Sequence, residues 1–478
     1  MKVLFVTSEC VPFCKTGGLA DVSGSLPQAL AANGDEVAVI MPLYQTVAEK
    51  YIEDLEFVKY IYITLAWRSL YCGLFRCEKD GVTYYFVDNE HYFARPDLYG
   101  YYDDGERFAY FSRSVVSLLT HLDFMPEVIH CNDWQTALVS IYLSDDAVRW
   151  DVLRSIRTVF TVHNIEYQGR YGRETLEDLF GLPCGWFDGG TIAFDGDINL
   201  LKGALLTSDA VTAVSPTYAQ ELKYAYFAHG MEGVMNLCDW KLYGVLNGID
   251  MERYDPSKDQ QIVKNYTAED LTGKAECKAA LQREMGLKED PDAPIVAVVS
   301  RLVSHKGLDL ICEALDGMMD LGIQFVVLGK GDWQYEEFFS NARYRFPGML
   351  AARIEYNEAT SMRIYSGADL FLMPSKSEPC GLSQMIAMRY GTLPIVRETG
   401  GLKDTVHPYE AWCGAGNGFS FANYHAGDMW YVVREAAELY RKDKEAFRKL
   451  QERGMTEDFS WKHSAEKYRR IYEQISNG

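Results

Sequence analysis

The chain has 478 residues, and its 47 Lys and Arg against 68 Asp and Glu give a formal net charge of −21 at neutral pH. An acidic excess of this size repels phosphate backbones, and no block of Lys and Arg offsets it, so we expect no binding to nucleic acid. At about 150 residues per domain, the length predicts two or three domains. With 48% hydrophobic and 24% charged residues, the composition excludes disordered and fibrous classes.

No apolar run approaches the roughly 18 residues that cross a bilayer, and Glu9 interrupts the opening segment too early for a secretory signal. We therefore expect a cytoplasmic protein that does not bind membranes. The eleven cysteines include no C-x-x-C pair and lack the partners that a zinc site needs, so we expect reduced thiols that act as small buried hydrophobic groups.

Short runs of branched apolar residues recur along the chain, each followed by a turn and a helical pattern, and this order is typical of parallel α/β layers. In chain order, the expected strands are residues 3–6, 37–41, 128–130, 158–162, 295–299, 325–328, 370–373 and 393–396. A polar stretch that begins near Asn247 separates two series of strands. The last helix is free to return to the first series. We therefore predict an N-terminal domain over residues 1–246, joined by the helix at about 461–478, and a C-terminal domain over residues 247–460.

Unusual polar residues and glycine turns follow the carboxyl ends of these strands, where ligands collect in open parallel sheets. In chain order, they are Lys15 with Gly17 and Gly18, Asp133 with Trp134, His163 with Asn164, Arg301 with Lys306, and the segment from Glu378 to Ser383. Their common position at strand ends predicts an active cleft.

Arg301 and Lys306 place two positive charges after one strand of an acidic protein, as a buried diphosphate requires. Gly381, Leu382 and Ser383 are expected to open a helix whose N–H groups point at the same phosphates. A nucleotide-linked donor follows from this reading. The alternative is a pair of solvated charges on the shoulder of a helix.

Three polar side chains have a functional and a structural interpretation. Glu378 is suited to accept hydrogen bonds from sugar hydroxyls and to favour positive charge at an anomeric carbon, or it caps a helix. His163 ends an apolar strand, where a neutral imidazole bonded to the backbone is common. Asp133 is either functional or an N-cap of the helix that follows it.

Three further segments have plainer interpretations. Asp195-Gly196-Asp197 resembles an acidic metal pair but has no third ligand nearby, so we expect a turn and no metal site. The aromatic stretch from Tyr84 to Phe111 either stacks on pyranose rings or packs in a core or subunit contact. The segments 16–21 and 399–404 share the pattern T-G-G-L-x-D, which suggests a glycine turn opening a helix in each half, with chance similarity as the alternative.

Four segments resemble those of bacterial glycogen synthase and plant starch synthase, which are retaining glucosyltransferases of GT-B fold. They are residues 15–22, His163-Asn164, residues 300–307, and residues 374–384 continuing to 399–402. The order and spacing agree over nearly the whole chain, and the K-T-G-G-L and E-P-C-G-L segments are specific together. The resemblance implies an α/β, GT-B fold: two Rossmann-like, doubly wound domains with a deep cleft between them, the first for the glucan acceptor and the second for the nucleotide-sugar donor.

The resemblance also implies residue roles. The catalytic residues it implies are Lys15, His163, Arg301, Lys306 and Glu378. The donor contacts it implies are Lys15, Gly17, Gly18, Asp21, Asn164, Arg301, Lys306, Tyr356, Cys380, Gly381, Leu382 and Ser383, with Tyr356 stacked on adenine. Asp133 and Trp134 would face the acceptor. Many members carry His where this chain has Gln135, which puts an acceptor contact there in doubt, whereas Ser383 keeps the hydroxyl of the usual Thr.

The reaction implied is transfer of glucose from ADP-glucose to the non-reducing 4-hydroxyl of an α-1,4-glucan, with retention and without a metal or other cofactor. Closure of the two domains would exclude water and so prevent hydrolysis. A related transferase that uses UDP-glucose or a small acceptor, and a non-catalytic glucan-binding homologue, remain alternatives. Intact Lys15, Arg301, Lys306 and Glu378 disfavour the binder. A nicotinamide dehydrogenase is excluded because no G-x-G-x-x-G follows the first strand.

Overall fold

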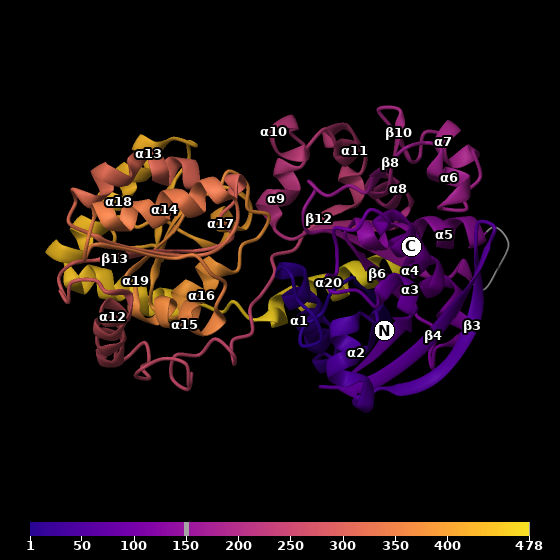
Figure 1. Cartoon of the computed structure of the whole chain (residues 1–478), viewed down its shortest axis with the longest axis horizontal. Coiled ribbons are helices and arrows are strands. Elements are labelled where there is room, and N and C mark those ends of the chain that lie inside the picture. The colour runs from indigo at the N-terminus through magenta and orange to yellow at the C-terminus, as the bar shows by residue number, and fades with distance from the viewer. Residues whose placement is uncertain (148–152, 478) are drawn as a thin grey trace. The chain divides into compact units, whose positions relative to one another are not determined.

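The computed structural model describes residues 1–147 and 153–477. The chain folds into two compact units: unit 1 is Met1–Gly248 with the segment that begins at Trp461, and unit 2 is Ile249–Ser460 (Figure 1). The chain therefore leaves unit 1 once and returns to it for its last helix. Each unit contains a largely parallel sheet with helices on its faces.

A nine-stranded sheet forms the centre of unit 1, in the order β12-β11-β7-β6-β1-β2-β5-β4-β3. All neighbours are parallel except that β4 runs antiparallel to β3 and β5. The strands are β1 (Lys2–Val6), β2 (Glu36–Pro42), β3 (Glu56–Leu65), β4 (Arg68–Lys79), β5 (Val82–Asp88), β6 (Val128–Asn132), β7 (Arg157–Val162), β11 (Ala210–Ala213) and β12 (Leu242–Gly244). A small sheet contains β8 (Arg170–Tyr171), β10 (Asp197–Asn199) and β9 (Ala193–Phe194).

The four strands expected in the first half are all present, because their side chains are buried on both faces and read as continuous apolar runs. The antiparallel strand β3 was not predicted. One face of β3 is exposed, so that Tyr60 and Tyr62 alternate with buried Ile63 and Leu65. Such a strand lacks the uninterrupted run that identified β1.

The helices of unit 1 are α1 (Gly18–Ala32), α2 (Gln45–Tyr51), α3 (Glu90–Phe93), α4 (Asp104–Leu118), α5 (Ala137–Ala147), α6 (Thr175–Asp178), α7 (Gly185–Asp188), α8 (Leu200–Thr207), α9 (Pro216–Glu221), α10 (Ala225–Ala228), α11 (Glu232–Leu237) and α20 (Trp461–Asn477). The last of these, α20, packs against α1. It buries Trp461, Tyr468 and Tyr472, and the Tyr472 hydroxyl lies 2.7 Å from Nδ1 of His130 in β6. These contacts attach the C-terminal helix to unit 1.

The buried His130 predicts how the stability of unit 1 depends on pH. Its Nε2 lies 2.6 Å from Thr161 Oγ1, and burial lowers the pKa of the ring to about 3. The unfolded chain has a histidine pKa of about 6.5, so it binds more protons than the folded chain between these values. Folding free energy from this group is fully present above pH 6.5 and falls as the pH drops, by at most about 1.4 kcal/mol per pH unit.

His130→Gln should remove this pH dependence. In urea unfolding between pH 7.5 and 5, the stability difference between wild type and His130→Gln should shrink as the pH falls. Comparing the two proteins cancels the contribution of every other titrating group. Parallel pH profiles for the two proteins would contradict the prediction, because they would mean that folding does not lower the pKa of His130.

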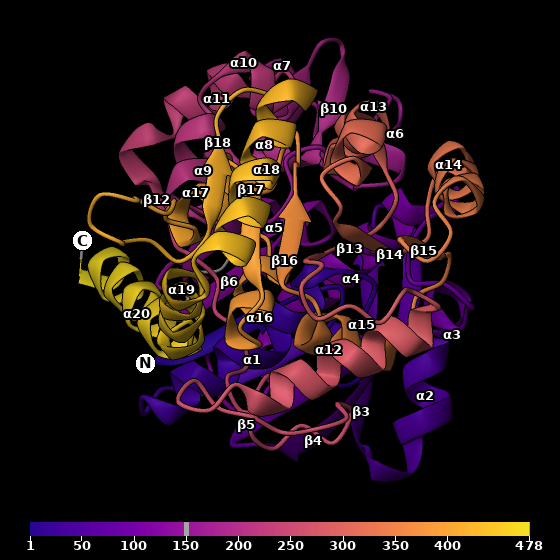
Figure 2. The same ribbon diagram turned by 90° about the vertical axis from the view of Figure 1, so that its left-hand side faces the viewer.

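Unit 2 is built on a six-stranded, fully parallel sheet in the order β15-β14-β13-β16-β17-β18, and the labels in Figure 2 follow this order from right to left. Its strands are β13 (Ile295–Val299), β14 (Gln324–Leu328), β15 (Leu350–Arg353), β16 (Leu370–Met373), β17 (Leu393–Arg397) and β18 (Phe419–Phe421). The helices α13 (Leu308–Met319), α14 (Trp333–Arg345) and α18 (Ala426–Lys442) lie on one side of this sheet, and α12 (Thr272–Met285), α15 (Glu358–Gly367) and α16 (Ser383–Arg389) lie on the other (Figure 1). The remaining helices are α17 (Gly400–Thr405) and α19 (Lys444–Thr456). All four strands expected in this half are present.

Two of the smaller predictions can be compared with the fold. Asp195 and Gly196 have φ of +52° and +87° and form the turn between β9 and β10, as expected. All eleven cysteines are free, but Cys184 and Cys413 are exposed, so the expectation that every thiol is buried was wrong for these two. Cys77 and Cys312 are half-buried, and the other seven are buried.

Candidate active site

The loop between β1 and α1 presents Lys15 and the glycine turn. Lys15 Nζ lies 2.7 Å from Asp21 Oδ1, so two residues predicted to contact the donor form an ion pair. A Cβ built on Gly18 meets no atom within 4 Å, which leaves the first turn of α1 open on this side. This openness is what close approach of a ligand to backbone N–H groups requires.

Glu9 holds this loop in place, a role that we did not predict from the sequence. Its Oε2 accepts hydrogen bonds from the backbone N–H and the hydroxyl of Thr16, each at 2.6 Å. Only 3% of Glu9 is exposed, and burial raises the pKa of its carboxyl above the usual value. A glutamate just beyond an apolar strand was the available signal.

Asp133 and His163 meet where β6 and β7 end. Asp133 Oδ1 accepts hydrogen bonds from the backbone N–H of His163 at 2.7 Å and of Asn164 at 3.4 Å. Asp133 has φ of +57°, an uncommon conformation for a residue other than glycine, and its side chain makes no helix-capping hydrogen bond. Asp133 does occupy the N-cap position of the turn Trp134–Thr136, but the capping role expected for its side chain was wrong: the carboxylate supports the loop that carries His163.

The protonation of this pair follows from burial. Burial raises the pKa of Asp133 to about 7, although the two N–H groups favour its charged form. Burial lowers the pKa of His163 to about 3, so its imidazole is neutral at physiological pH. The sequence-based alternative of a neutral histidine at a strand end is therefore correct about the charge. It is wrong about the partner, because the ring is hydrogen-bonded to a side chain rather than to the backbone: Nε2 lies 2.9 Å from Asn132 Oδ1.

Trp134 and the aromatic stretch lie mostly in the core. The Trp134 ring contacts Phe108 edge-on at 5.4 Å, and a Cβ on Gly169 would lie 2.7 Å from that indole. Within the stretch 84–111, Tyr84, Tyr92 and Tyr110 are almost fully buried. The packing interpretation therefore holds for these tyrosines, while Tyr102 is fully exposed.

In unit 2, Lys306 and Glu378 form one cluster. Lys306 Nζ donates to both carboxylate oxygens of Glu378, at 2.9 and 2.7 Å, and Ser375 Oγ donates to Oε2 at 2.9 Å. Glu378 is 7% exposed. Burial favours its neutral form, but Lys306 and Ser375 outweigh burial and hold the pKa of this carboxyl below its usual value. Glu378 is thus ionised although its side chain is almost inaccessible to water.

Glu378 does not cap α16, so the N-cap interpretation was wrong here too. The N-cap of α16 is Leu382, without a side-chain bond, and Gly381 before it has φ of +70°. Ser383 is the first helical residue, and the buried Cys380 lies on the chain between Glu378 and this turn. The helix itself has only seven residues.

The loops around this cluster are packed backbone to backbone. A Cβ on Gly307, just after Lys306, would lie 2.0 Å from Pro374 O, and the N–H of Lys376 donates to His305 O at 2.8 Å. Arg397, at the end of β17, donates to the carbonyl of Lys376 at 2.9 Å. This buried arginine was not singled out from the sequence, because it reads as the last residue of a strand.

The second T-G-G-L segment supports the Glu378 loop. Gly400 has φ of +45°, and a Cβ there would lie 2.0 Å from Glu378 O; one on Gly401 would lie 2.1 Å from Cys380 O. Both T-G-G-L segments open a helix, α1 and α17, but only the second is closely packed. The two segments therefore share a sequence pattern but differ in how closely their glycines are packed.

Gly400→Ala should destabilise unit 2 by about 2 kcal/mol or more, because the new Cβ meets backbone rather than a movable side chain. Thermal or urea unfolding measures the loss. Gly18→Ala is the matched control: it also opens a helix, but its Cβ meets nothing, so stability should stay within about 0.5 kcal/mol of wild type. Equal effects of the two substitutions would refute the packing argument.

The side chains of Arg301 and Tyr356 are exposed. Arg301 follows β13, is exposed, and forms no ion pair with any carboxylate of the described residues. Tyr356 precedes α15 and is 82% exposed. Both side chains are thus accessible to a ligand at the edge of unit 2 where β13 ends.

Comparisons with known proteins identify the family. The starch synthase catalytic domain model matches residues 2–237, and the model for glycosyl transferases group 1 matches residues 283–453. Glycogen synthase from Lactobacillus acidophilus is 45% identical over 475 residues, covering 99% of this chain and 100% of that protein. The chain belongs to the glycogen synthase family. A Geobacillus thermodenitrificans glycogen synthase is 47% identical over 99% of this chain and 98% of its own length.

Solved structures agree with this membership. The catalytic domain of starch synthase IV from Arabidopsis thaliana, solved with ADP and acarbose, matches with a TM-score of 0.92 and 35% identity over 100% of this chain and 99% of that one. Sucrose-phosphate synthase from Thermosynechococcus elongatus matches with a TM-score of 0.61 and 16% identity over 99% and 98%, a likeness of fold alone. This glycogen synthase family member is therefore a glycosyltransferase with the GT-B fold.

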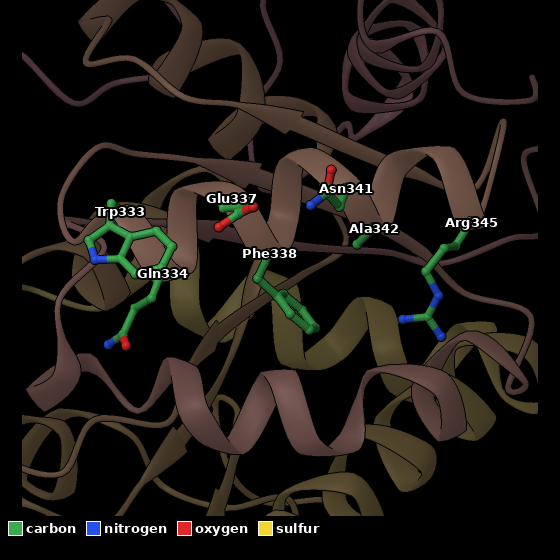
Figure 3. A pocket seen from close by; sticks show the side chains of 7 residues that line it. All are labelled: Trp333, Gln334, Glu337, Phe338, Asn341, Ala342 and Arg345. Carbon is green, nitrogen blue, oxygen red and sulfur yellow. The ribbon is translucent and has the colours of Figure 1, made fainter.

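Features elsewhere in this glycogen synthase family member lie apart from the candidate site. Figure 3 shows a pocket beside α14, lined by Trp333, Gln334, Glu337, Phe338, Asn341, Ala342 and Arg345. None of these is a predicted site residue, and Arg345 pairs with Asp316. Within the two described stretches, no cluster of three His, Cys, Asp or Glu is arranged for a metal, and no helix has the length and apolarity to cross a bilayer.

Proposed function

We propose that this enzyme transfers glucose from ADP-glucose to the non-reducing 4-hydroxyl of an α-1,4-glucan with retention of configuration. The observation that carries the proposal is the buried cluster of Lys306, Glu378 and Ser375. These residues and the exposed Arg301 follow the carboxyl ends of the neighbouring strands β13 and β16. It combines cations for a diphosphate with an ionised acceptor for sugar hydroxyls. The family membership and the ADP-bound starch synthase relative support ADP-glucose as the donor.

In this proposal unit 2 binds the donor. Arg301 and Lys306 neutralise the diphosphate, backbone N–H groups at Gly381, Leu382 and Ser383 donate to it, and the exposed ring of Tyr356 stacks on adenine. Cys380 contacts the donor within the same loop. The positive charges of Arg301 and Lys306 stabilise the negative charge that develops on the leaving ADP when the glycosidic bond breaks.

Lys306 changes partners during the reaction in this proposal. In the structure it neutralises Glu378. A bound diphosphate competes for the same ammonium, which leaves the Glu378 oxygens to accept hydrogen bonds from the glucosyl hydroxyls and to favour a cationic anomeric carbon. Ser375 donates to one carboxylate oxygen, Oε2, and the glycine loop packs against the backbone of Glu378, so little reorganisation is needed.

Unit 1 supplies the groups around the sugar and the acceptor. Lys15, Gly17 and Gly18 contact the donor, with Asp21 and Asn164 near the glucosyl group and His163 beside the anomeric centre. Asp133 and Trp134 act on the acceptor side mainly through the loop and core that they hold.

A nucleotide-release assay tests the function. The protein is incubated with ADP-glucose or UDP-glucose, with and without glycogen, and the released nucleotide and the lengthened glucan are measured. Release of ADP that depends on glycogen, with the α configuration in the product, is expected. A preference for UDP-glucose, or transfer only to a small acceptor, would indicate a related transferase instead. No release of nucleotide from either donor would indicate a non-catalytic glucan-binding homologue.

Activity should survive EDTA, because Arg301 and Lys306 supply positive charge to the diphosphate. Initial rates with ADP-glucose and glycogen should change less than about twofold after chelation. A loss of activity restored by magnesium would assign the diphosphate charge to a metal and would return attention to Asp195 and Asp197.

A further inference from the structure

Asn132, the last residue of β6, is fully buried, and its amide orientation is fixed. Nδ2 donates to Val6 O at 3.0 Å and to His130 O at 3.4 Å. Both partners are carbonyl oxygens, which only accept hydrogen bonds. Turning the amide over would place oxygen against oxygen, so Oδ1 must point away from these carbonyls.

The direction of Oδ1 determines where the proton sits on His163. Oδ1 lies 2.9 Å from Nε2 of that ring. Because an amide oxygen only accepts, Nε2 carries the hydrogen, and because burial keeps the ring neutral, Nδ1 carries a lone pair. Nδ1 has no hydrogen-bond partner among residues 1–147 and 153–477, so this acceptor is available to a ligand.

Two consecutive residues thus hydrogen-bond to the backbone and to the ring of His163. Asp133 accepts the backbone N–H of His163, and Asn132 accepts the ring N–H. Neither contact uses Nδ1. A histidine held in this way presents one defined acceptor, whereas a ring free to change tautomer would present a donor for part of the time.

We propose that Asn132 is a positioning residue that keeps His163 in the Nε2–H tautomer, so that Nδ1 accepts a hydrogen bond from a hydroxyl of the reacting sugar. The identity of that hydroxyl-bearing ligand rests on the proposed function, but the tautomer does not. A neutral acceptor suits a site where positive charge develops on the sugar, because an imidazolium there would repel it.

The tautomer is measured directly by NMR of the full-length protein labelled with ¹⁵N-histidine, in which the ring nitrogen shifts distinguish Nε2–H, Nδ1–H and the cation. The His163 signals are assigned by comparison with His163→Gln. Wild type should show the Nε2–H form alone at pH 7. Asn132→Leu, which is similar in size but has no acceptor, should show a mixture of tautomers.

The same variant tests the link to catalysis. Turnover by Asn132→Leu should fall at least tenfold, with the KM for ADP-glucose within threefold of wild type. Thr136→Val is the matched control, because Thr136 Oγ1 accepts the backbone N–H of Asn132 at 2.7 Å and has no hydrogen bond to His163 among the described residues. It disturbs the same buried backbone but should keep the Nε2–H form and at least a third of the turnover.

Asn132→Asp provides a second variant should the leucine protein fail to fold. It keeps an acceptor at Nε2 but adds negative charge, so His163 should titrate at a higher pH than in wild type. A wild-type spectrum with the Nδ1–H form, or an unchanged spectrum in Asn132→Leu, would overturn the role of Asn132. A mixture of tautomers with unchanged turnover would overturn the use of Nδ1 in the reaction. If wild type transfers no glucose but shows the expected spectrum, the proposed function fails and the Asn132 contact stands.

Discussion

Lys306→Ala is expected to lower turnover at least about 10²-fold, which corresponds to about 2.7 kcal/mol of lost transition-state stabilisation. The diphosphate loses one of its two cations while Arg301 remains. Glu378, which is 7% exposed, also loses the ammonium that donates to both of its oxygens. The initial rate of ADP release at saturating ADP-glucose and glycogen measures the effect.

The unfolding free energy of the same variant should depend on pH in a defined direction. Without Lys306, burial dominates and raises the pKa of Glu378 above the ordinary glutamate value of about 4.3. The folded variant then binds more protons than its unfolded chain above that pH, so its stability deficit relative to wild type should grow as the pH rises. Lys449→Ala, which removes an exposed lysine paired with Glu445 on α19, should change neither turnover nor this pH profile. Unchanged kinetics in Lys306→Ala would remove Lys306 from the diphosphate.

Glu378→Gln is expected to lower turnover by a similar factor, about 10²-fold, without weakening donor binding. The amide keeps the shape and a hydrogen bond to Ser375 but has no charge to favour a cationic anomeric carbon. It also releases Lys306 from its ion pair, so the KM for ADP-glucose should stay the same or fall. Steady-state rates over a range of ADP-glucose concentrations separate the two parameters.

The comparison of the two variants is informative because they remove opposite halves of one ion pair. Lys306→Ala should raise the dissociation constant of ADP, whereas Glu378→Gln should not. Binding of ADP measured by calorimetry provides this readout without turnover. A pure loss of affinity in Glu378→Gln would contradict a role for the carboxylate in the transition state.

The sequence predicted eight of the buried parallel strands and the loops at their carboxyl ends, because such strands are continuous apolar runs and are followed by polar residues and glycines. It also grouped Lys306 with Glu378 at one sheet edge, although it assigned them to different parts of the donor. Their direct ion pair was not predicted, since the residues are 72 positions apart and nothing local relates their side-chain directions.

The supporting residues were harder to find from the sequence. Glu9 and Arg397 act through hydrogen bonds to the backbone of loops, and Asn132 acts through the backbone of Val6 and the ring of His163. The sequence around these residues does not indicate those partners. Asp133 stands at the start of a helical turn, but its side chain accepts the backbone N–H of His163, a contact that the sequence did not predict. Roles that depend on contacts between distant loops become visible only when the strands are placed side by side.

The return of α20 to unit 1 has a consequence for biosynthesis. Unit 2 is an insertion within the chain of unit 1, and residues 249–460 emerge from the ribosome before the helix that completes the first unit. During translation His130 in β6 lacks its partner Tyr472, and α1 lacks the helix that packs against it, until the last few residues are made. Nascent chains that stop short of α20 should therefore expose apolar surface on unit 1 and bind chaperones while unit 2 is already folded.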